Sequence, residues 1–243
     1  MKNSIGNGEY AVVTGASSGL GKSIALELAS RHVNTILIAR RGVREVSRMC
    51  IGKGTDSVFY ETDLTDEKAL LDMVRDIASK YPVSILVNNA GTGGSNIFGK
   101  VPVEYLDNIL NLNIRSTVLM THGLLPELLA RERAYILNIS SLASLTPTGF
   151  KTVYPASKMF VSGFSTGLRE ELKNTSVSVS VALPGAMATS PAMEERIKSQ
   201  GKIGRFLTIP PDTAAKDFVD GMFRRKAVIV SGTSNRLSCQ GLA

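Results

Sequence analysis

Short apolar runs alternate with stretches of helical periodicity along most of the chain, and this alternation limits the possible folds more than any other feature. The runs lie at 10–14, 34–39, 57–61, 83–89, 134–140, 176–183 and 227–231. Between them, apolar residues recur at helical spacing over 20–31, 66–79 and about 103–125, and a further helix follows Pro155. Strands that are apolar on both faces are typical of a parallel sheet covered by helices on both sides. We therefore expect one α/β domain over residues 1–243, built on a doubly wound parallel sheet of about seven strands.

Composition narrows the classes of function. The formal net charge of +7 comes from scattered residues, which favours a small phosphorylated ligand over nucleic acid. Cys50 and Cys239 are too few for a disulfide framework, and together with His32 and His122 they lack the spacing of metal ligands, so no metal is expected. The amino terminus is polar, and no apolar run approaches the ~18 residues of a membrane-spanning helix. We expect a cytoplasmic protein.

A glycine-rich segment, TGASSGLG at 14–21, follows the first apolar run. Glycine lets the backbone approach an anion closely, and the helix that follows presents free N–H groups to a pyrophosphate. The alternative is a turn that only packs the strand against the helix. The position of the glycine-rich segment between the first strand and the first helix favours a dinucleotide site of the Rossmann type. The expected ligand-contacting residues of this loop are Gly15, Ser17, Ser18, Gly19 and Leu20.

A tyrosine and a lysine stand four residues apart in YPASK at 154–158. Because Pro155 is tolerated in the first turn of a helix, Tyr154 is expected at the start of a helix, with Lys158 one turn later on the same face. A nearby ammonium stabilises a phenolate and lowers the pKa of the phenol. Taken alone, the pair is better explained as a partly buried tyrosine beside a solvated lysine, so the rest of the chain has to decide.

The motifs TGASSGLG, NNAG at 88–91 and YPASK occur in this order, and with them the chain resembles the short-chain dehydrogenase/reductase family over essentially its whole length. The G-x-x-x-G-x-G spacing fits the single-domain branch of that family. The resemblance implies a catalytic set of Asn113, Ser141, Tyr154 and Lys158. Tyr154 would be the general acid, Ser141 would polarise a carbonyl, Lys158 would lower the pKa of the phenol and bind the nicotinamide ribose, and Asn113 would fix a water that links Lys158 to solvent.

These residues also raise two alternative functions. Ser141 lacks the G-x-S-x-G elbow of a hydrolase nucleophile and has no histidine in the late position, which excludes that chemistry. A non-catalytic NADPH-binding sensor on the same fold is the remaining alternative. Such a protein would be expected to lose the tyrosine or the lysine, and this chain keeps both.

The second apolar run ends in Arg40 and Arg41, where folds that prefer NAD place a carboxylate. Because guanidinium groups pair well with a phosphate, the expected cofactor is NADP(H). The resemblance implies further cofactor contacts at the adenine, the adenosine ribose and the nicotinamide. These are expected at Asp63, Leu64, Asn89, Ala90, Gly91, Pro184, Gly185, Met187 and Thr189, besides Tyr154 and Lys158.

The implied reaction is NADPH-dependent reduction of a ketone or aldehyde to an alcohol. Residues 190–210 match the place of the family's mobile substrate lid. Several apolar residues occur here and in the loop before Tyr154, and an apolar substrate pocket and plain helix packing explain them equally well. They are Leu142, Leu145, Pro147, Phe150, Met193, Ile197, Phe206 and Leu207. Lys198, Lys202 and Arg205 could meet an acidic carrier or a coenzyme A phosphate, but a solvated face explains them better. The substrate is either a 3-oxoacyl group on a carrier or a steroid or xenobiotic ketone, and the resemblance implies a homodimer or homotetramer.

Overall fold

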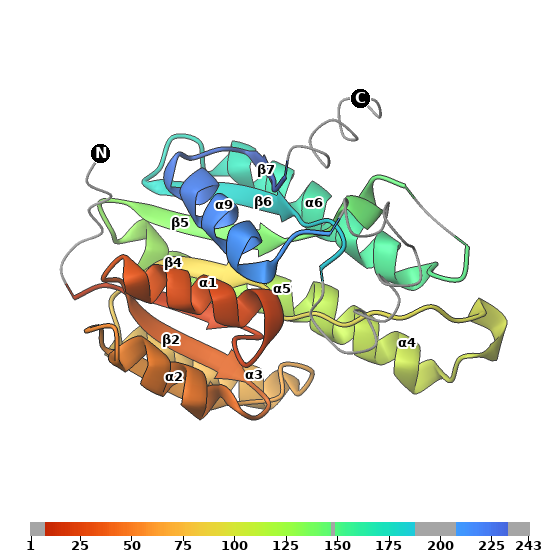
Figure 1. Cartoon of the computed structure of the whole chain (residues 1–243), viewed down its shortest axis with the longest axis horizontal. Coiled ribbons are helices and arrows are strands. Elements are labelled where there is room, and N and C mark those ends of the chain that lie inside the picture. Colours follow the sequence, from red (N-terminus) through yellow and green to blue (C-terminus); the bar gives the residue numbers. More distant parts are fainter. Residues whose placement is uncertain (1–7, 147–148, 188–207, 233–243) are drawn as a thin grey trace.

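The structure, a computed structural model, describes residues 8–146, 149–187 and 208–232. Within these residues seven strands form one parallel sheet in the order β3-β2-β1-β4-β5-β6-β7 (Figure 1). The strands are β1 (Tyr10–Thr14), β2 (Asn34–Ala39), β3 (Ser57–Glu61), β4 (Val83–Asn88), β5 (Ala134–Ile139), β6 (Val177–Leu183) and β7 (Val228–Val230). Each strand lies within one residue of the run that predicts it, so the doubly wound α/β fold is confirmed.

Helices cover both faces of the sheet. One face carries α1 (Gly19–Ser30), α2 (Val43–Ile51) and α9 (Pro211–Phe223), and the other carries α3 (Glu67–Lys80), α5 (Ser116–Leu129) and α6 (Val153–Glu171). Helix α4 (Val103–Leu110) runs through a π-helical segment, η2 (Asn111–Arg115), directly into α5, and short 3₁₀ turns occur at η1 (Phe98–Lys100) and η3 (Leu142–Ser144). Each face of the sheet packs its own hydrophobic layer against these helices.

Two helices were not predicted from the sequence. Helix α2 reads as a polar, basic stretch, yet Val43, Val46 and Cys50 are buried at helical spacing against the sheet. Helix α9 begins with Pro211 in its first turn and buries Phe218 and other apolar residues on one side. Both segments carry apolar residues at i, i+3, i+4 spacing, so the sequence does contain the signal for these two helices.

The order of the strands reverses between β1 and β4. The chain runs outward from β1 to β2 and β3, then crosses back so that β4 pairs with the other side of β1, with Val13 beside Val87. The carboxyl ends of β1 and β4 therefore diverge into loops on either side of a crevice, which is where open α/β sheets bind their ligands. Among the helices of the described part of the chain, none has the length and apolar character needed to cross a membrane.

Candidate active site

The glycine-rich segment forms the tight turn between β1 and α1 that its sequence predicts. Gly15 and Gly19 adopt positive φ angles of 66° and 54°, which favour glycine. A Cβ on Gly21 would lie 2.2 Å from the Gly15 carbonyl oxygen, so the first turn of α1 packs against the loop with no room for a side chain. Ser18 at the N-cap makes no side-chain capping bond, which leaves the backbone N–H groups at this helix start available to an anion.

The loop after β4 is fastened to the end of β1. The Thr14 hydroxyl accepts hydrogen bonds from the backbone N–H groups of Asn89 (2.9 Å) and Ala90 (3.0 Å), and the Asn89 amide donates to the Thr14 carbonyl at 2.9 Å. A Cβ on Gly15 would meet Ala90 Cα at 2.9 Å. The two segments with the TGASSGLG and NNAG motifs thus form one wall of the crevice.

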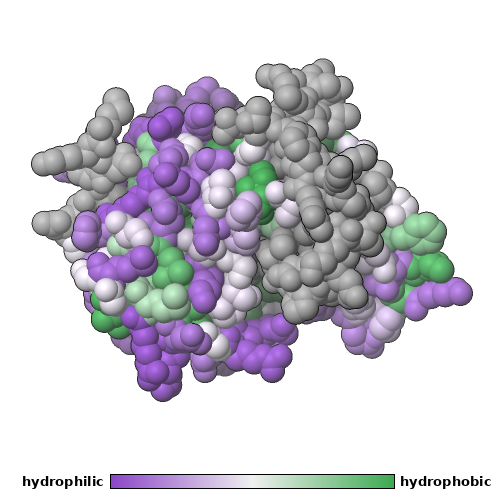
Figure 2. Space-filling view, in the orientation of Figure 1, coloured by the Kyte–Doolittle hydropathy of each residue, from purple (hydrophilic) through white to green (hydrophobic). Residues whose placement is uncertain are grey.

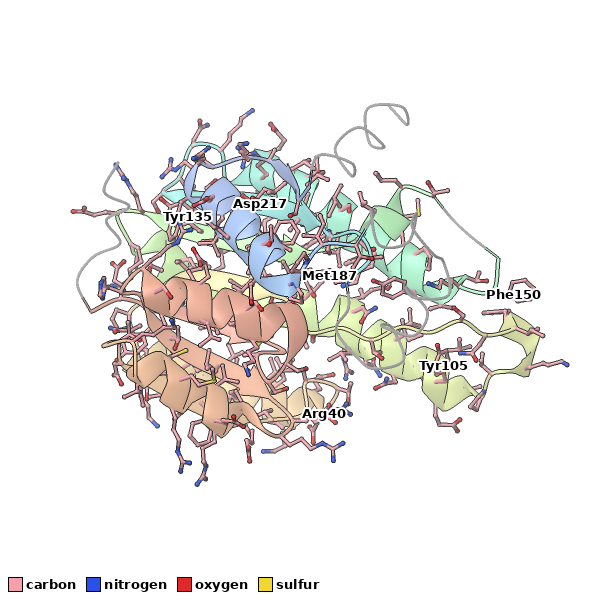
Figure 3. All side chains as sticks on the ribbon, viewed as in Figure 1. Arg40, Tyr105, Tyr135, Phe150, Met187 and Asp217 are labelled. Carbon is pink, nitrogen blue, oxygen red and sulfur yellow. The ribbon has the colours of Figure 1, made fainter. Side chains whose placement is uncertain are left out.

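The residues expected to select the cofactor gather beside this wall. Arg40 and Arg41 are exposed at the end of β2 (Figure 3), and Asp63 is exposed after β3 while Leu64 is buried. Partial burial opposes ionisation of Asp63, but hydrogen bonds from Thr65 and the charge of Arg40 together lower its pKa below the usual value. The structure therefore brings Arg40 and Asp63 together. An arginine that can pair with a phosphate thus lies next to a carboxylate that can accept a hydrogen bond from an amino group.

Ser141, Tyr154 and Lys158 come together where β5 ends and α6 begins. Tyr154 is the second residue of α6, as its position before Pro155 predicts, and the Ser141 hydroxyl lies close enough to its phenol to lower the pKa of that phenol. Lys158 lies one turn later and is 5% exposed, and its Nζ donates to the Ile139 carbonyl at 2.8 Å. The helix thus places a phenol and an ammonium on one buried face at the end of a strand.

Burial dominates the titration of both groups. Burial raises the pKa of the Tyr154 phenol, and the nearby Ser141 hydroxyl offsets this rise only in part. Burial lowers the pKa of the Lys158 ammonium to about 8. The sequence predicts that Lys158 lowers the pKa of the phenol, but in this structure burial raises that pKa and only Ser141 opposes the rise.

Asn113 lies in the π-helical segment and is 1% exposed. Its Oδ1 accepts from the Thr92 N–H at 2.8 Å, and its Nδ2 donates to the Thr92 carbonyl and to the Ser157 hydroxyl, both at 2.9 Å. Ser157 in turn donates to the Tyr154 carbonyl at 2.7 Å. Both amide hydrogens of Asn113 are therefore used within the protein, and a water on this side chain could bind only to the remaining lone pair of Oδ1.

The segment after β6 continues the same edge of the sheet. The Leu142 N–H donates to the Pro184 carbonyl at 3.0 Å, and Gly185 and Met187 follow, the latter packed against the core (Figure 3). Thr189 lies outside the described residues. Residues 190–207 of the lid expected over 190–210 also lie outside them. The same holds for several of the apolar and basic residues assigned to the substrate side, namely Pro147, Met193, Ile197, Lys198, Lys202, Arg205, Phe206 and Leu207.

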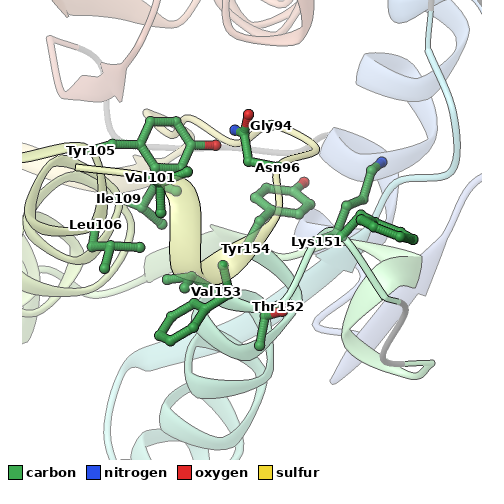
Figure 4. Close-up of a pocket in the computed structure, with 12 residues that line it drawn as sticks. Gly94, Asn96, Val101, Tyr105, Leu106, Ile109, Lys151, Thr152, Val153 and Tyr154 are labelled. Carbon is green, nitrogen blue, oxygen red and sulfur yellow. The ribbon is translucent and has the colours of Figure 1, made fainter. Parts of the chain in front are cut away.

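A shallow pocket adjoins Tyr154 (Figure 4), and the about 270 Å³ of empty space measured there includes open solvent. Of the expected pocket residues that the structure describes, Phe150 lines it, whereas Leu142 and Leu145 do not. Sequence reasoning missed the rest of its wall, which comes from the loop after β4 and from α4. It also missed Gly93, where a Cβ would stand 2.4 Å from the Tyr154 ring. The sequence signal for this part of the site was the pair of glycines shortly after the NNAG motif.

The sequence model of the family described as short chain dehydrogenase matches residues 9–200. The chain belongs to the short-chain dehydrogenase family. This confirms the resemblance on which the catalytic and cofactor residues were assigned. It also places the glycine loop, the NNAG segment and the Tyr154–Lys158 pair in the matched part of the chain.

Among relatives of this short-chain dehydrogenase, a very-long-chain 3-oxoacyl-CoA reductase of Anas platyrhynchos is 38% identical over 193 residues, covering 76% of this chain and 61% of the relative. The 17-beta-hydroxysteroid dehydrogenase type 3 of Homo sapiens is 33% identical over 192 residues, covering 75% of this chain and 60% of the relative. The chain thus spans about three fifths of the length of these relatives.

Solved structures agree on the fold. A short-chain dehydrogenase from Sphingobium yanoikuyae in complex with NADPH superposes with a TM-score of 0.83 at 24% identity, covering 96% of this chain and 92% of the other. A metagenomic short-chain oxidoreductase in complex with NADP superposes with a TM-score of 0.76 at 29% identity, covering 92% and 96%. Both superpositions support the fold described above.

Proposed function

We propose that this short-chain dehydrogenase is an NADPH-dependent reductase that converts a ketone or aldehyde into an alcohol. The observation that carries the proposal is the placement of the Ser141 hydroxyl beside the Tyr154 phenol, one helical turn from the buried Lys158. A polarising hydroxyl, a proton donor and a source of positive charge are the groups that carbonyl reduction needs. They stand at the carboxyl edge of the sheet, beside the crevice expected to bind the dinucleotide.

The residues at this crevice fit NADP(H). The pyrophosphate would lie on the free N–H groups at the start of α1, against Gly15, Ser17, Ser18, Gly19 and Leu20. Arg40 and Arg41 would pair with the 2′-phosphate, and Asp63 and Leu64 would hold the adenine. Asn89, Ala90, Gly91, Tyr154 and Lys158 would contact the two riboses, and Pro184, Gly185, Met187 and Thr189 the nicotinamide. When bound, NADPH supplies the hydride.

The proton steps belong to the protein. Ser141 would donate a hydrogen bond to the carbonyl oxygen and draw electron density away from the carbon. As the carbon accepts a hydride, the π electrons of the C=O bond move to oxygen, and Tyr154 transfers its phenolic proton there. The Lys158 ammonium would stabilise the phenolate that remains. Asn113 and Ser157 hold the backbone of the Tyr154 turn and the loop opposite it, which fixes the distance between donor and substrate.

We further propose 3-oxoacyl thioesters as the first substrates to test. Relatives that share 33–38% identity with the chain include 3-oxoacyl-CoA reductases and a steroid dehydrogenase, so steroid ketones are the second class. A homodimer or homotetramer and a cytoplasmic location stay predictions from the resemblance and from the composition.

The test is loss of NADPH absorbance with a panel of 3-oxoacyl thioesters, steroid ketones, sugars and small aromatic carbonyls, repeated with NADH. We expect turnover with NADPH on one class and a loss of about 10²–10⁴-fold in kcat for Tyr154→Phe. The matched control is Tyr135→Phe, which removes a phenolic hydroxyl from a buried tyrosine of β5 away from the site. Tight NADPH binding without turnover on any class would favour a non-catalytic NADPH sensor instead.

A separate pair of variants tests the cofactor preference. Arg40→Ala and Arg41→Ala should each raise KM for NADPH and leave KM for NADH nearly unchanged, because only the phosphorylated ribose has a charge to lose. Lys53→Ala, which removes one positive charge from an exposed loop after α2, is the control. A wild-type preference for NADH would refute the role given to the two arginines.

A further inference from the structure

The pocket next to Tyr154 is apolar on most of its wall. Three parts of the chain form it: the loop after β4, helix α4 and the start of α6 with the residues before it (Figure 4). Its apolar lining comes from Phe98, Val101, Leu106, Ile109, Phe150 and Val153. Lys151 is the one charged residue among the described residues that line it.

Two aromatic side chains at this pocket are unusually exposed. Phe98 is 58% and Phe150 is 67% exposed, and the neighbouring Ile97 is 49% exposed. In Figure 2 hydrophobic colour gathers at the same end of the molecule, which Figure 1 identifies as the loop before α4. Apolar surface that gathers beside a concave site is typical of a ligand-binding region.

A backbone link holds these aromatic residues in place. The Asn96 N–H donates to the Phe150 carbonyl at 2.6 Å, which ties the loop after β4 to the segment before α6. Tyr105 closes the loop from the other side, since a Cβ on Gly94 would stand 2.4 Å from the Tyr105 hydroxyl. The wall of the pocket is therefore built by contacts between segments far apart in the sequence.

We propose that this pocket binds the unreactive hydrocarbon chain of the substrate, and so selects ketones or 3-oxoacyl compounds that carry an unbranched apolar chain of several carbons. The proposal rests on the reductase function, because Tyr154 belongs both to the pocket wall and to the pair with Ser141. A carbonyl oxygen at the Tyr154 hydroxyl leaves the neighbouring carbons of its substrate next to the pocket. A polyhydroxylated substrate would find too few polar partners there.

The first experiment measures kcat/KM with NADPH for 2-butanone, 2-hexanone, 2-octanone and 2-decanone. For the wild type we expect a rise of up to about fourfold per added methylene until the pocket is filled. Val101→Trp places a large ring in the pocket from a half-buried position, and it should abolish the rise with chain length. Leu110→Trp is the control, because Leu110 is on the same helix as Leu106 but exposed and outside the lining, so this variant should keep the rise.

A second experiment reads binding without catalysis. The chain contains no tryptophan, so Phe98→Trp gives a single fluorophore at the pocket. We expect 2-decanone to shift its emission to shorter wavelength and 2-butanone to leave it unchanged. If Val101→Trp abolishes turnover of every ketone, this titration alone decides whether the pocket binds the hydrocarbon chain.

The outcomes separate the two proposals. If 2-butanone is reduced but chain length affects neither kcat/KM nor the Phe98→Trp emission, the pocket assignment is wrong and the reductase function stands. If no carbonyl compound is reduced but 2-decanone still shifts the emission, the reductase function fails while the pocket still binds hydrocarbon chains. A rise with chain length that Val101→Trp and Leu110→Trp affect equally would also overturn the assignment to this pocket.

Discussion

Burying Lys158 should make the folded protein less stable at neutral pH, and replacing this lysine by methionine should therefore stabilise it. Burial lowers the pKa of the Lys158 ammonium from 10.5 to about 8. At about 1.4 kcal/mol for each tenfold change in the proton equilibrium, this difference corresponds to about 3 kcal/mol of unfavourable free energy at pH 7. Lys158→Met removes it but also loses the hydrogen bond to the Ile139 carbonyl, a loss of about 1 kcal/mol. The expected net gain at pH 7 is about 2 kcal/mol.

The pH dependence identifies the cause. Between pH 8 and 10.5 the unfolded chain binds the proton of Lys158 and the folded chain does not, so the contribution of this lysine to stability rises with pH. The unfavourable free energy is fully present below pH 8 and is nearly gone above pH 10.5. The advantage of Lys158→Met over the wild type should therefore shrink by about 2–3 kcal/mol from pH 7 to pH 10.

Urea unfolding of the cofactor-free proteins at pH 7, 8.5 and 10 measures this difference directly. Lys53→Met removes an exposed lysine after α2 and should show no comparable change with pH. Subtracting the wild type at each pH cancels the titration of all other groups. If the difference between Lys158→Met and the wild type is the same at pH 7 and pH 10, Lys158 does not titrate in this window and the reasoning from burial is refuted.

Two further predictions concern local structure. Gly21→Ala would bring Cβ within 2.2 Å of the Gly15 carbonyl oxygen, so it should lower both Tm and NADPH affinity. Gly163→Ala on α6 meets nothing within 4 Å and should stabilise the protein by about 0.5–1 kcal/mol. Equal effects of the two variants in urea unfolding would contradict this contrast. Asp66→Ala removes the side chain that caps α3 by accepting from the Ala69 N–H at 3.0 Å, so it should lower the stability by about 1 kcal/mol. Asp66→Asn keeps a capping oxygen and should lower the stability less. Thermal unfolding of the two variants measures the difference.

The strands could be predicted from the sequence because this sheet is covered on both faces, which makes each strand a nearly continuous apolar run. The serines of β6 do not obscure this strand, because Ser178 and Ser180 are buried beside Val179 and Val181. The parallel direction of the strands followed from the same reasoning, because alternating strands and helices imply parallel crossovers, whereas the order of the strands is known only from the structure. The glycine loop and the Tyr154 turn were predictable for a different reason, since both depend on short contiguous segments.

The pocket wall could not be predicted, because it depends on contacts that no local pattern encodes. The hydrogen bond from Asn96 to Phe150 joins two loops that follow different strands. The π-helical segment around Asn113 adds one residue to a turn of an otherwise regular helix, and its side chain holds Thr92 in the facing loop. For the apolar residues before Tyr154 the sequence leaves a substrate pocket and plain helix packing open, and among those described only Phe150 lines the pocket.

The same burial that destabilises the fold gives Lys158 its chemical value. A Cβ on Gly91 would lie 3.2 Å from both the Asn113 Oδ1 and the Lys158 Nζ, so the loop after β4 presses a glycine backbone against the lysine and leaves it little solvent. On the surface its ammonium would keep a pKa near 10.5 and would hold its proton at any physiological pH. With a pKa of about 8 the group is still charged at pH 7, where it can stabilise a phenolate at Tyr154, yet it can release a proton at a small free-energy cost. A residue that must both stabilise the tyrosinate and return a proton to it after each turnover needs this intermediate basicity, and the fold obtains it by giving up stability.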